Sequence, residues 1–149
     1  MARSLYTARA HVTGGREQGH GVTSDGMLDL QLRTPVDMGG DGGGTNPEQL
    51  FAVGYAACFE GALGVVGRRE QVDLGAVAIE AEVSLITTET RGFTVAVGLD
   101  VSLPGISDPD RAVSLVAAAH QVCPYSNATR GNVQVNLSAN GRPVPDADT

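Results

Sequence analysis

The chain has 149 residues, of which 10 are Lys or Arg and 17 are Asp or Glu, giving a formal net charge of -7 and a pI near 4.7. This length fits one domain over residues 1–149 with a core of its own. The acidic balance argues against nucleic acid as a partner, because a phosphate backbone requires a basic face. No apolar run reaches the roughly 18 residues of a membrane span, and the first residues contain no apolar signal segment. We therefore expect a cytoplasmic protein with no membrane partner.

The first fifty residues contain two expected strands and one loop. Apolar and polar residues alternate over 4–13 and 27–33, which is typical of half-buried strands. Residues 39–44 read Gly-Gly-Asp-Gly-Gly-Gly, which is too rich in glycine for a regular element. The stretch lacks the Gly-Lys-Ser/Thr ending of a phosphate loop, so we interpret it as a solvated loop and not as a nucleotide site.

A long buried helix is expected next. Its start is marked by a capping side chain, a proline suited to the first turn and an acidic residue at the positive end of the helix dipole, in the stretch Thr45, Asn46, Pro47 and Glu48. The helix is expected to run to about Gly67, and Glu60 is the lone charge in its body. A helix that is apolar on every side must be covered on every side, whereas its own sheet covers only one. Small residues recur three and four positions apart and would permit a second chain to pack closely, so we expect a homodimer; they are Gly54, Ala57, Cys58, Gly61 and Gly64.

The remaining elements are two long strands, a second helix and a last strand, at residues 74–88, 92–103, 107–123 and 133–139. A short turn at Arg91 and Gly92 makes the two long strands an antiparallel hairpin. The second helix must end by Cys123, because Pro124 disfavours helical geometry in the residue before it. This order of elements predicts an α+β fold with a mainly antiparallel sheet.

The two cysteines are the residues most suited to chemistry. Cys58 lies half-way along the long helix and Cys123 at the end of the second, so the pair forms no CxxC motif. In the cytoplasm such cysteines are more often reactive thiols or ligands than a structural disulfide. Three interpretations stay open: two small core residues, a metal site completed by His120 with His11 or His20, or a redox pair.

The redox interpretation requires a cation beside the nucleophile. A free thiol has a pKa near 8.5 and burial raises it, so Cys58 by itself would hold little thiolate at neutral pH. Lowering the pKa by two units requires about 2.7 kcal/mol of differential stabilisation, which one guanidinium can supply. Arg16 is the candidate, because Gly14 and Gly15 before it permit a sharp turn that directs the arginine inward. Glu48 is its natural orienting partner, since arginine and carboxylate form a bidentate pair of fixed geometry.

Four segments carry a resemblance to a known family: Gly14–Arg16, Thr45–Ala52, Gly54–Phe59 and Val122–Asn132. They resemble the organic hydroperoxide resistance proteins, the Ohr branch of the Ohr/OsmC family, and the resemblance covers residues 4–139. The resemblance implies an α+β fold in which antiparallel β-sheets wrap around two long central helices of an intertwined homodimer.

The resemblance also implies a chemistry, that of a thiol-dependent peroxidase. Cys58 matches the peroxidatic cysteine of the A-A-C-F motif and Cys123 the resolving cysteine of V-C-P-Y-S-N, while Arg16 and Glu48 match the arginine after Gly-Gly and the glutamate of N-P-E-Q. An alkyl or fatty-acyl hydroperoxide would become an alcohol as Cys58 forms a sulfenic acid and then a disulfide with Cys123. A lipoyl dithiol, dihydrolipoamide or a lipoylated protein, would reduce the disulfide, so neither a bound cofactor nor a metal is expected.

Apolar residues near Cys58, for which we select Phe51 and Tyr125, are expected to bind the substrate and to favour alkyl over hydrogen peroxide. One alternative is a non-catalytic redox or zinc-binding module that uses Cys58, Cys123 and His120. Another is a thiol hydrolase, which requires a base beside the nucleophile. The sequence does not place any histidine there.

Helix geometry adds an expectation about the assembly. Glu48 and Cys58 are ten residues apart on one helix, which separates them by about 15 Å along its axis. An arginine does not comfortably bridge that gap. We therefore expect Glu48 of one subunit to orient an Arg16 that faces Cys58 of the other.

Overall fold

The contacts in the computed structural model, which describes residues 2–145, divide the chain into one unit that ends at Leu50 and another that begins at Phe51. The expected single domain over residues 1–149 stays a prediction.

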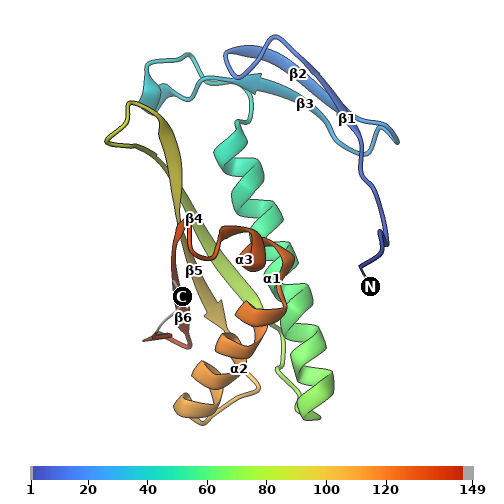
Figure 1. Ribbon diagram of the computed structural model, residues 1–149, viewed down its shortest axis with the longest axis vertical. Helices are drawn as coiled ribbons and strands as arrows, with labels where there is room; N and C mark the ends of the chain where they lie inside the picture. The colour runs from blue at the N-terminus through green and yellow to red at the C-terminus, as the bar shows by residue number, and fades with distance from the viewer. Residues whose placement is uncertain (1, 146–149) are drawn as a thin grey trace. The chain divides into compact units, whose positions relative to one another are not determined.

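The first unit is an antiparallel sheet in the order β1-β2-β3, formed by Ala10–Thr13, Gln18–Thr23 and Asp29–Arg33 (Figure 1). The strand expected at residues 27–33 is confirmed, but only the last four residues of the expected 4–13 strand are in β1. Strand β2 was not expected, because Gly19 and Gly21 interrupt the alternation that marks a strand. The backbone requires glycine at 19, since a Cβ there would lie 1.9 Å from the carbonyl oxygen of Gly15.

The glycine-rich loop follows a short 3-10 helix, η1 (Val36–Met38), and returns to β3. The backbone N–H of Thr45 donates to the carbonyl oxygen of Gln31 at 2.8 Å, and Arg33 donates in turn to Thr45 at 3.0 Å. A Cβ on Gly44 would lie 2.5 Å from the Gln31 carbonyl oxygen. The loop is mostly exposed, as expected. Its last glycine, Gly44, also allows the loop backbone to pass close to the backbone of β3.

Helix α1 (Pro47–Glu70) begins where the capping signal predicts. The cap is Asn46, whose Oδ1 accepts the backbone N–H of Gln49 at 2.9 Å. The helix continues three residues past the expected end at Gly67, and two arginines in its last turn suit the negative end of the helix dipole. One side of α1 packs into the core of the second unit, whereas Val53 on another side is 71% exposed.

The apolar character of α1 would also suit a membrane span by length and composition, with a mean hydropathy of 1.6 over the most apolar window. A third of that window is buried within the chain. The core helix of a soluble protein meets the same criterion, so this finding by itself is weak support for a span.

The second unit contains a four-stranded sheet in the order β4-β5-β6-β7, formed by Ala78–Thr87, Phe93–Ser102, Gln134–Ala139 and Arg142–Pro143. The expected antiparallel hairpin is confirmed as β4 and β5, and the expected last strand as β6. The sheet is mainly antiparallel, as the order of elements predicts, but the β5–β6 pair is parallel, which corrects the antiparallel sheets that the resemblance implies. A parallel pair requires a crossover, and the helical segment between these two strands supplies it.

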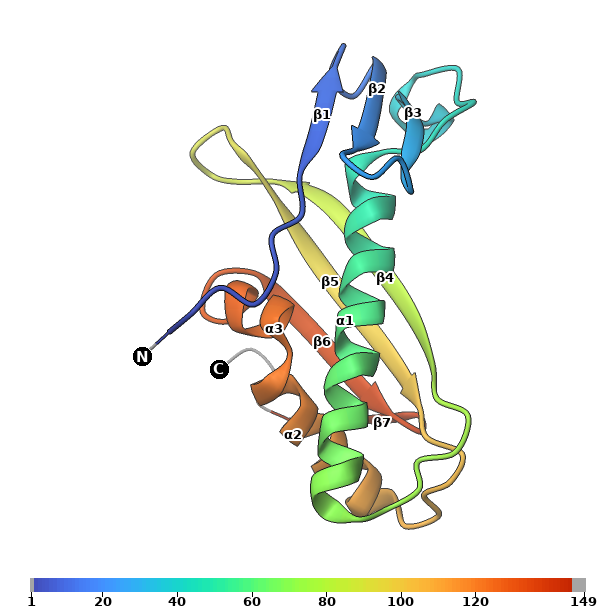
Figure 2. The same cartoon turned by 90° about the vertical axis from the view of Figure 1, so that its right-hand side faces the viewer.

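Helix α2 (Pro109–Val122) is capped by Asp108 and ends before Cys123, as expected. A further helix, α3 (Pro124–Thr129), was not expected. Pro124 ends one helix and begins the next, because a proline disfavours helix before it but is well suited to a first helical position. Helices α1, α2 and α3 lie on the same face of the β4–β6 sheet, where the core is packed (Figure 2).

Candidate active site

Cys58 and Cys123 meet inside the second unit. Cys58 lies in the middle of α1, partly buried against the core, and Cys123 is fully buried between α2 and α3. Both are free thiols, and they lie close enough for Cys123 to affect the pKa of Cys58. The structure thus brings together two cysteines that are 65 positions apart in the sequence.

The pKa of the Cys58 thiol is raised, and burial is the largest cause. A hydrogen bond from the backbone of Tyr125 lowers the pKa, and the hydrogen bond and charge of Cys123 raise it. The two residues named as causes, Tyr125 and Cys123, both belong to the second unit. We expect Arg16 to lower the pKa of Cys58, and this effect stays a prediction.

Arg16 and Glu48 form a bidentate ion pair in the first unit. The Arg16 Nη2 donates to Glu48 Oε1 at 3.0 Å and Nη1 donates to Oε2 at 3.3 Å. The Glu48 side chain is 15% exposed and that of Arg16 37%. The expected orienting pair is therefore formed within one chain, from residues 32 positions apart. A carboxylate on two guanidinium nitrogens fixes the plane of the guanidinium and leaves other N–H groups available to a ligand.

The loop before Arg16 turns as the glycines predict. Gly14 and Gly15 have φ angles of 75° and 63°, in the left-handed region that favours glycine. A Cβ on Gly14 would lie 2.4 Å from the carbonyl oxygen of Gln18, so the loop closes on the start of β2.

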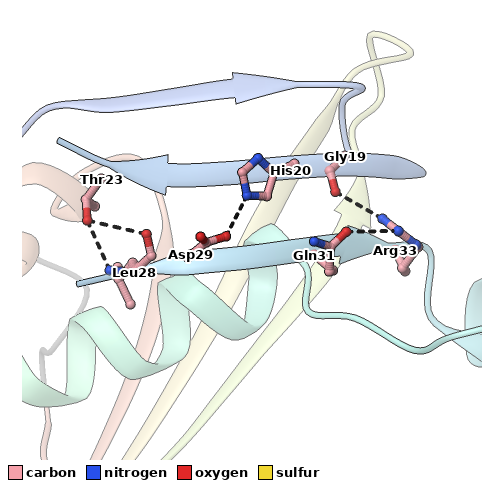
Figure 3. A network of polar contacts seen from close by, with 7 residues as sticks. All are labelled: Gly19, His20, Thr23, Leu28, Asp29, Gln31 and Arg33. Carbon is pink, nitrogen blue, oxygen red and sulfur yellow. Dashed lines mark hydrogen bonds and ion pairs between the residues drawn. The ribbon is translucent and has the colours of Figure 1, made fainter. Parts of the chain in front are cut away.

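The strands after this loop are joined by side-chain contacts (Figure 3). Arg33 on β3 donates to the carbonyl oxygen of Gly19 and to the side-chain oxygen of Gln31, each at 3.0 Å. His20 pairs with Asp29 across β2 and β3. These contacts hold β2, and with it the end of the Arg16 loop, against β3.

Three aromatic rings lie together in the second unit. Phe51 and Tyr125, the expected substrate-binding residues, meet edge to face with centroids 5.9 Å apart, and Tyr55 lies 5.6 Å from Tyr125. Tyr125 is 39% exposed, whereas Tyr55 is fully buried. The Tyr125 hydroxyl rests on α1 at Gly54, where a Cβ would lie 3.0 Å from it. Tyr125 also contacts Cys58 through its backbone, so this aromatic cluster adjoins the thiol.

His120 lies in the core and its Nδ1 is 2.8 Å from the Ser126 hydroxyl. Among residues 2–145, no group of three or more His, Cys, Asp or Glu side chains is placed to hold a metal ion. His20, an expected further ligand, is paired with Asp29.

Sequence reasoning missed the polar residues around Cys123. Ser126 and Tyr55 have hydroxyls 2.8 Å apart inside the core, and Thr129 is 3.3 Å from Tyr55. Ser126 and Thr129 belong to the Val122–Asn132 motif that carries the resemblance. A linear pattern does not show that they lie next to Tyr55 on another helix.

Comparison with known proteins decides the family. The OsmC-like protein family matches the chain over residues 40–138. An organic hydroperoxide resistance protein of Xanthomonas axonopodis pv. citri is 53% identical over 136 residues, which cover 90% of this chain and 94% of the relative. The chain belongs to the OsmC-like family, in its organic hydroperoxide resistance branch.

Other members of this branch agree in sequence and in structure. The organic hydroperoxide resistance protein OhrB of Bacillus subtilis is 46% identical, with 90% of this chain and 97% of the relative covered. A crystal structure of an organic hydroperoxide resistance protein from Legionella pneumophila matches with a TM-score of 0.86 at 51% identity, covering 91% of this chain and 98% of that one. The OsmC-like match includes Glu48, Cys58 and Cys123.

Proposed function

We propose that the chain is a thiol-dependent peroxidase that reduces organic hydroperoxides to alcohols. The observation that carries this proposal is the pair of free thiols, Cys58 and Cys123, which lie close enough for Cys123 to affect the pKa of Cys58, because two adjacent thiols can supply the two electrons that a peroxide takes up. Cys58 is the more accessible of the two, so it meets the substrate, and the fully buried Cys123 follows as the resolving thiol. The relatives named for organic hydroperoxide resistance support the substrate class.

In the first step the Cys58 thiolate attacks the outer peroxide oxygen, the O–O bond breaks, and the alkoxide leaves as an alcohol after taking up a proton. Cys58 becomes a sulfenic acid. The Cys123 thiol then attacks the Cys58 sulfur, and the disulfide forms with loss of water. Arg16, held in plane by Glu48, stabilises the thiolate and the charge that develops on the peroxide oxygen.

The reductant is a lipoyl dithiol, dihydrolipoamide or a lipoylated protein, which returns both cysteines to thiols by exchange. No bound cofactor takes part. The protein acts in the cytoplasm as a homodimer, and the exposed side of α1 at Val53 supports the dimer because it leaves an apolar face for a second copy.

The test is consumption of tert-butyl hydroperoxide with dihydrolipoamide as the reductant, followed by counting of free thiols. We expect turnover, and we expect the oxidant alone to remove two thiols per chain. A non-catalytic zinc module would instead hold metal at stoichiometry and show no turnover, and that result would reject the proposal.

A further inference from the structure

A chain of buried polar groups passes next to Cys123. The Tyr55 hydroxyl is 2.8 Å from the Ser126 hydroxyl, which is 2.8 Å from Nδ1 of His120. Tyr55 and Ser126 are fully buried and His120 nearly so. The three side chains come from α1, α3 and α2, so this polar chain joins all three helices of the second unit.

Cys123 is enclosed by these contacts. His120 precedes it by three residues and Ser126 follows it by three, and the backbone between them bends at Cys123 with φ and ψ of -62° and 123°. The Cys123 N–H donates to the Ala119 carbonyl at 2.9 Å, and its own carbonyl accepts from Asn127 at 3.0 Å. Ser126, on one flank of the bend, is hydrogen-bonded both to His120 on the other flank and to Tyr55 on the helix that carries Cys58.

A second contact joins α2 to α3. Arg130, directly after α3, donates from Nη2 to the carbonyl oxygen of His120 at 2.6 Å and from Nη1 to Asn127 at 2.7 Å. It binds a carbonyl in the last turn of α2, where helix carbonyls lack partners within the helix. The end of α2 is thus connected to α3 by two contacts, one through the His120 ring and one through the His120 carbonyl.

The directions of the hydrogen bonds are consistent with a fully paired network. Thr129 donates to the Ser126 carbonyl at 3.2 Å, so its hydroxyl can accept from Tyr55 at 3.3 Å. Burial raises the pKa of Tyr55, so its hydroxyl keeps its proton and acts as a donor. In the core the loss of one member removes a hydrogen bond from each of its partners, which favours a single arrangement of the helices over alternatives.

We propose that His120 and Ser126 are positioning residues for the resolving cysteine: by joining the two flanks of the α2–α3 bend to each other, and one of them to Tyr55, they set the path along which the Cys123 sulfur reaches the Cys58 sulfenic acid. The inference rests on the proposed peroxidase function and assigns these residues to its second step. In that step the Cys58 S–O bond breaks, the S–S bond forms, and the Cys123 proton leaves with the hydroxide as water. A disulfide requires a narrow range of geometry, so small displacements of the bend slow its formation strongly.

The experiment measures the two steps separately after one equivalent of tert-butyl hydroperoxide, and over-oxidation after an excess, because conversion of the sulfenic to the sulfinic acid consumes a second peroxide. Peroxide consumption reports Cys58 oxidation, and quenched thiol counting with mass spectrometry reports the disulfide and over-oxidised Cys58. In His120→Leu we expect disulfide formation to slow by about tenfold or more, sulfinic acid to accumulate at Cys58, and the first step to stay within about twofold of wild type.

Matched variants separate positioning from stability. His120→Asn keeps a side-chain amide near the place of Nδ1 and should restore most of the disulfide rate. Ser126→Ala removes one hydroxyl only, so it should fold even where His120→Leu does not, and should slow the same step. Val101→Ala, in the core at β5, serves as the destabilised control and should leave the ratio of the two rates unchanged.

Equal slowing of both steps, or a wild-type disulfide rate in folded Ser126→Ala, would overturn the inference. The azo oxidant diamide provides a second route to the Cys58–Cys123 disulfide, in which the two thiols are oxidised and diamide is reduced to the hydrazine. If wild type consumed no hydroperoxide, the peroxidase proposal would fail. Slow disulfide formation with diamide in His120→Leu would still support the positioning role.

Discussion

At the scale of single residues, the reactivity of Cys58 depends on opposing influences on its pKa. Burial raises the pKa, and the one hydrogen bond that lowers it comes from the backbone of Tyr125. Only the thiolate attacks a peroxide, so a thiol with a raised pKa reacts slowly at neutral pH. A cation is required to reverse the shift, and Arg16 with its carboxylate partner is the one we propose.

Replacing Arg16 by alanine should therefore change the pH dependence of the first step. Without the guanidinium the raised pKa of Cys58 is unopposed, the thiolate fraction at neutral pH falls, and the rate should increase as pH rises towards that pKa. We expect a loss of about a hundredfold at pH 7, as for removal of one electrostatic stabiliser of a transition state. Stopped-flow kinetics between pH 6 and about 10 measure this, with thiolate absorbance as the direct titration.

Arg16→Lys is the matched variant. It retains a positive charge but lacks the planar fork that Glu48 orients, so it should recover only part of the rate. An unchanged Cys58 pKa in Arg16→Ala would remove Arg16 from the site.

The two cysteines should respond differently to serine. Cys58→Ser should abolish peroxide reduction, because a serine hydroxyl is not ionised near neutral pH. Cys123→Ser should complete one turnover and then stall, with Cys58 advancing to sulfinic acid. Burst kinetics and mass spectrometry of Cys58 measure both. Full steady-state activity of Cys123→Ser with dihydrolipoamide would contradict a resolving role.

Selectivity for alkyl hydroperoxides should depend on the aromatic cluster of Phe51 and Tyr125. Replacing Tyr125 by alanine removes apolar contact area next to Cys58 but keeps the backbone N–H that it donates. We expect kcat/KM for cumene hydroperoxide to fall about tenfold and that for hydrogen peroxide to change little, since only the former buries apolar surface. Comparable wild-type efficiencies for the two peroxides would contradict this selectivity.

At the scale of elements, helix α1 has two different sides. One side carries buried residues such as Phe59 and Leu63, and the other leaves Val53 exposed. A Cβ built on Gly61 has nothing within 4 Å, so alanine there meets no steric obstacle within one chain. Glycine inside a helix costs about 0.5–1 kcal/mol relative to alanine, and this chain contains four such glycines in α1, at 54, 61, 64 and 67. Close packing of a second copy would explain why Gly61 is glycine.

Gly61 provides the test of that packing. In an isolated chain Gly61→Leu should stabilise α1, but in the homodimer its side chain would enter a filled interface, at a cost of about 1–3 kcal/mol. We therefore expect weaker dimerisation in sedimentation velocity. Ser114→Leu, at an exposed position of α2, is the control and should leave the dimer intact. Dimerisation of Gly61→Leu as tight as that of wild type would place the interface elsewhere.

At the scale of the whole molecule, we expect each active site to contain residues of both subunits. Glu48 and Cys58 are ten residues apart on α1, and Glu48 already binds Arg16 of its own chain. We expect this pair to serve Cys58 of the other subunit, which would make the dimer obligatory for catalysis.

Mixed dimers of Cys58→Ser and Glu48→Ala chains test this arrangement. If Glu48 acts across the interface, both changes fall in one site and the other stays intact, so the heterodimer should keep about half of wild-type activity. If each site is built within one chain, both are broken. Absence of activity in purified, differently tagged heterodimers would exclude the shared site.

The sequence by itself determined the features that depend on neighbouring residues. Asn46 and Pro47 mark the start of α1, Pro124 marks the end of α2, and alternation marks the β4–β5 hairpin. Caps, prolines and periodicity act over a few positions, so they can be identified in a linear pattern. The motifs around Cys58 and Cys123 indicated the family for the same reason.

Only the tertiary structure decided the features that depend on distant partners. The β2 strand exists because β1 and β3 pair with it in spite of its glycines, and β6 is parallel because α2 crosses the sheet before it. His120, a possible ligand by its spacing from Cys123, is instead hydrogen-bonded to Ser126 and through it to Tyr55. The pKa of Cys58 depends on burial, which is a property of the packed core. Contacts of this kind form only when strand register and helix packing bring separated residues within a few ångströms, and no local pattern encodes that proximity.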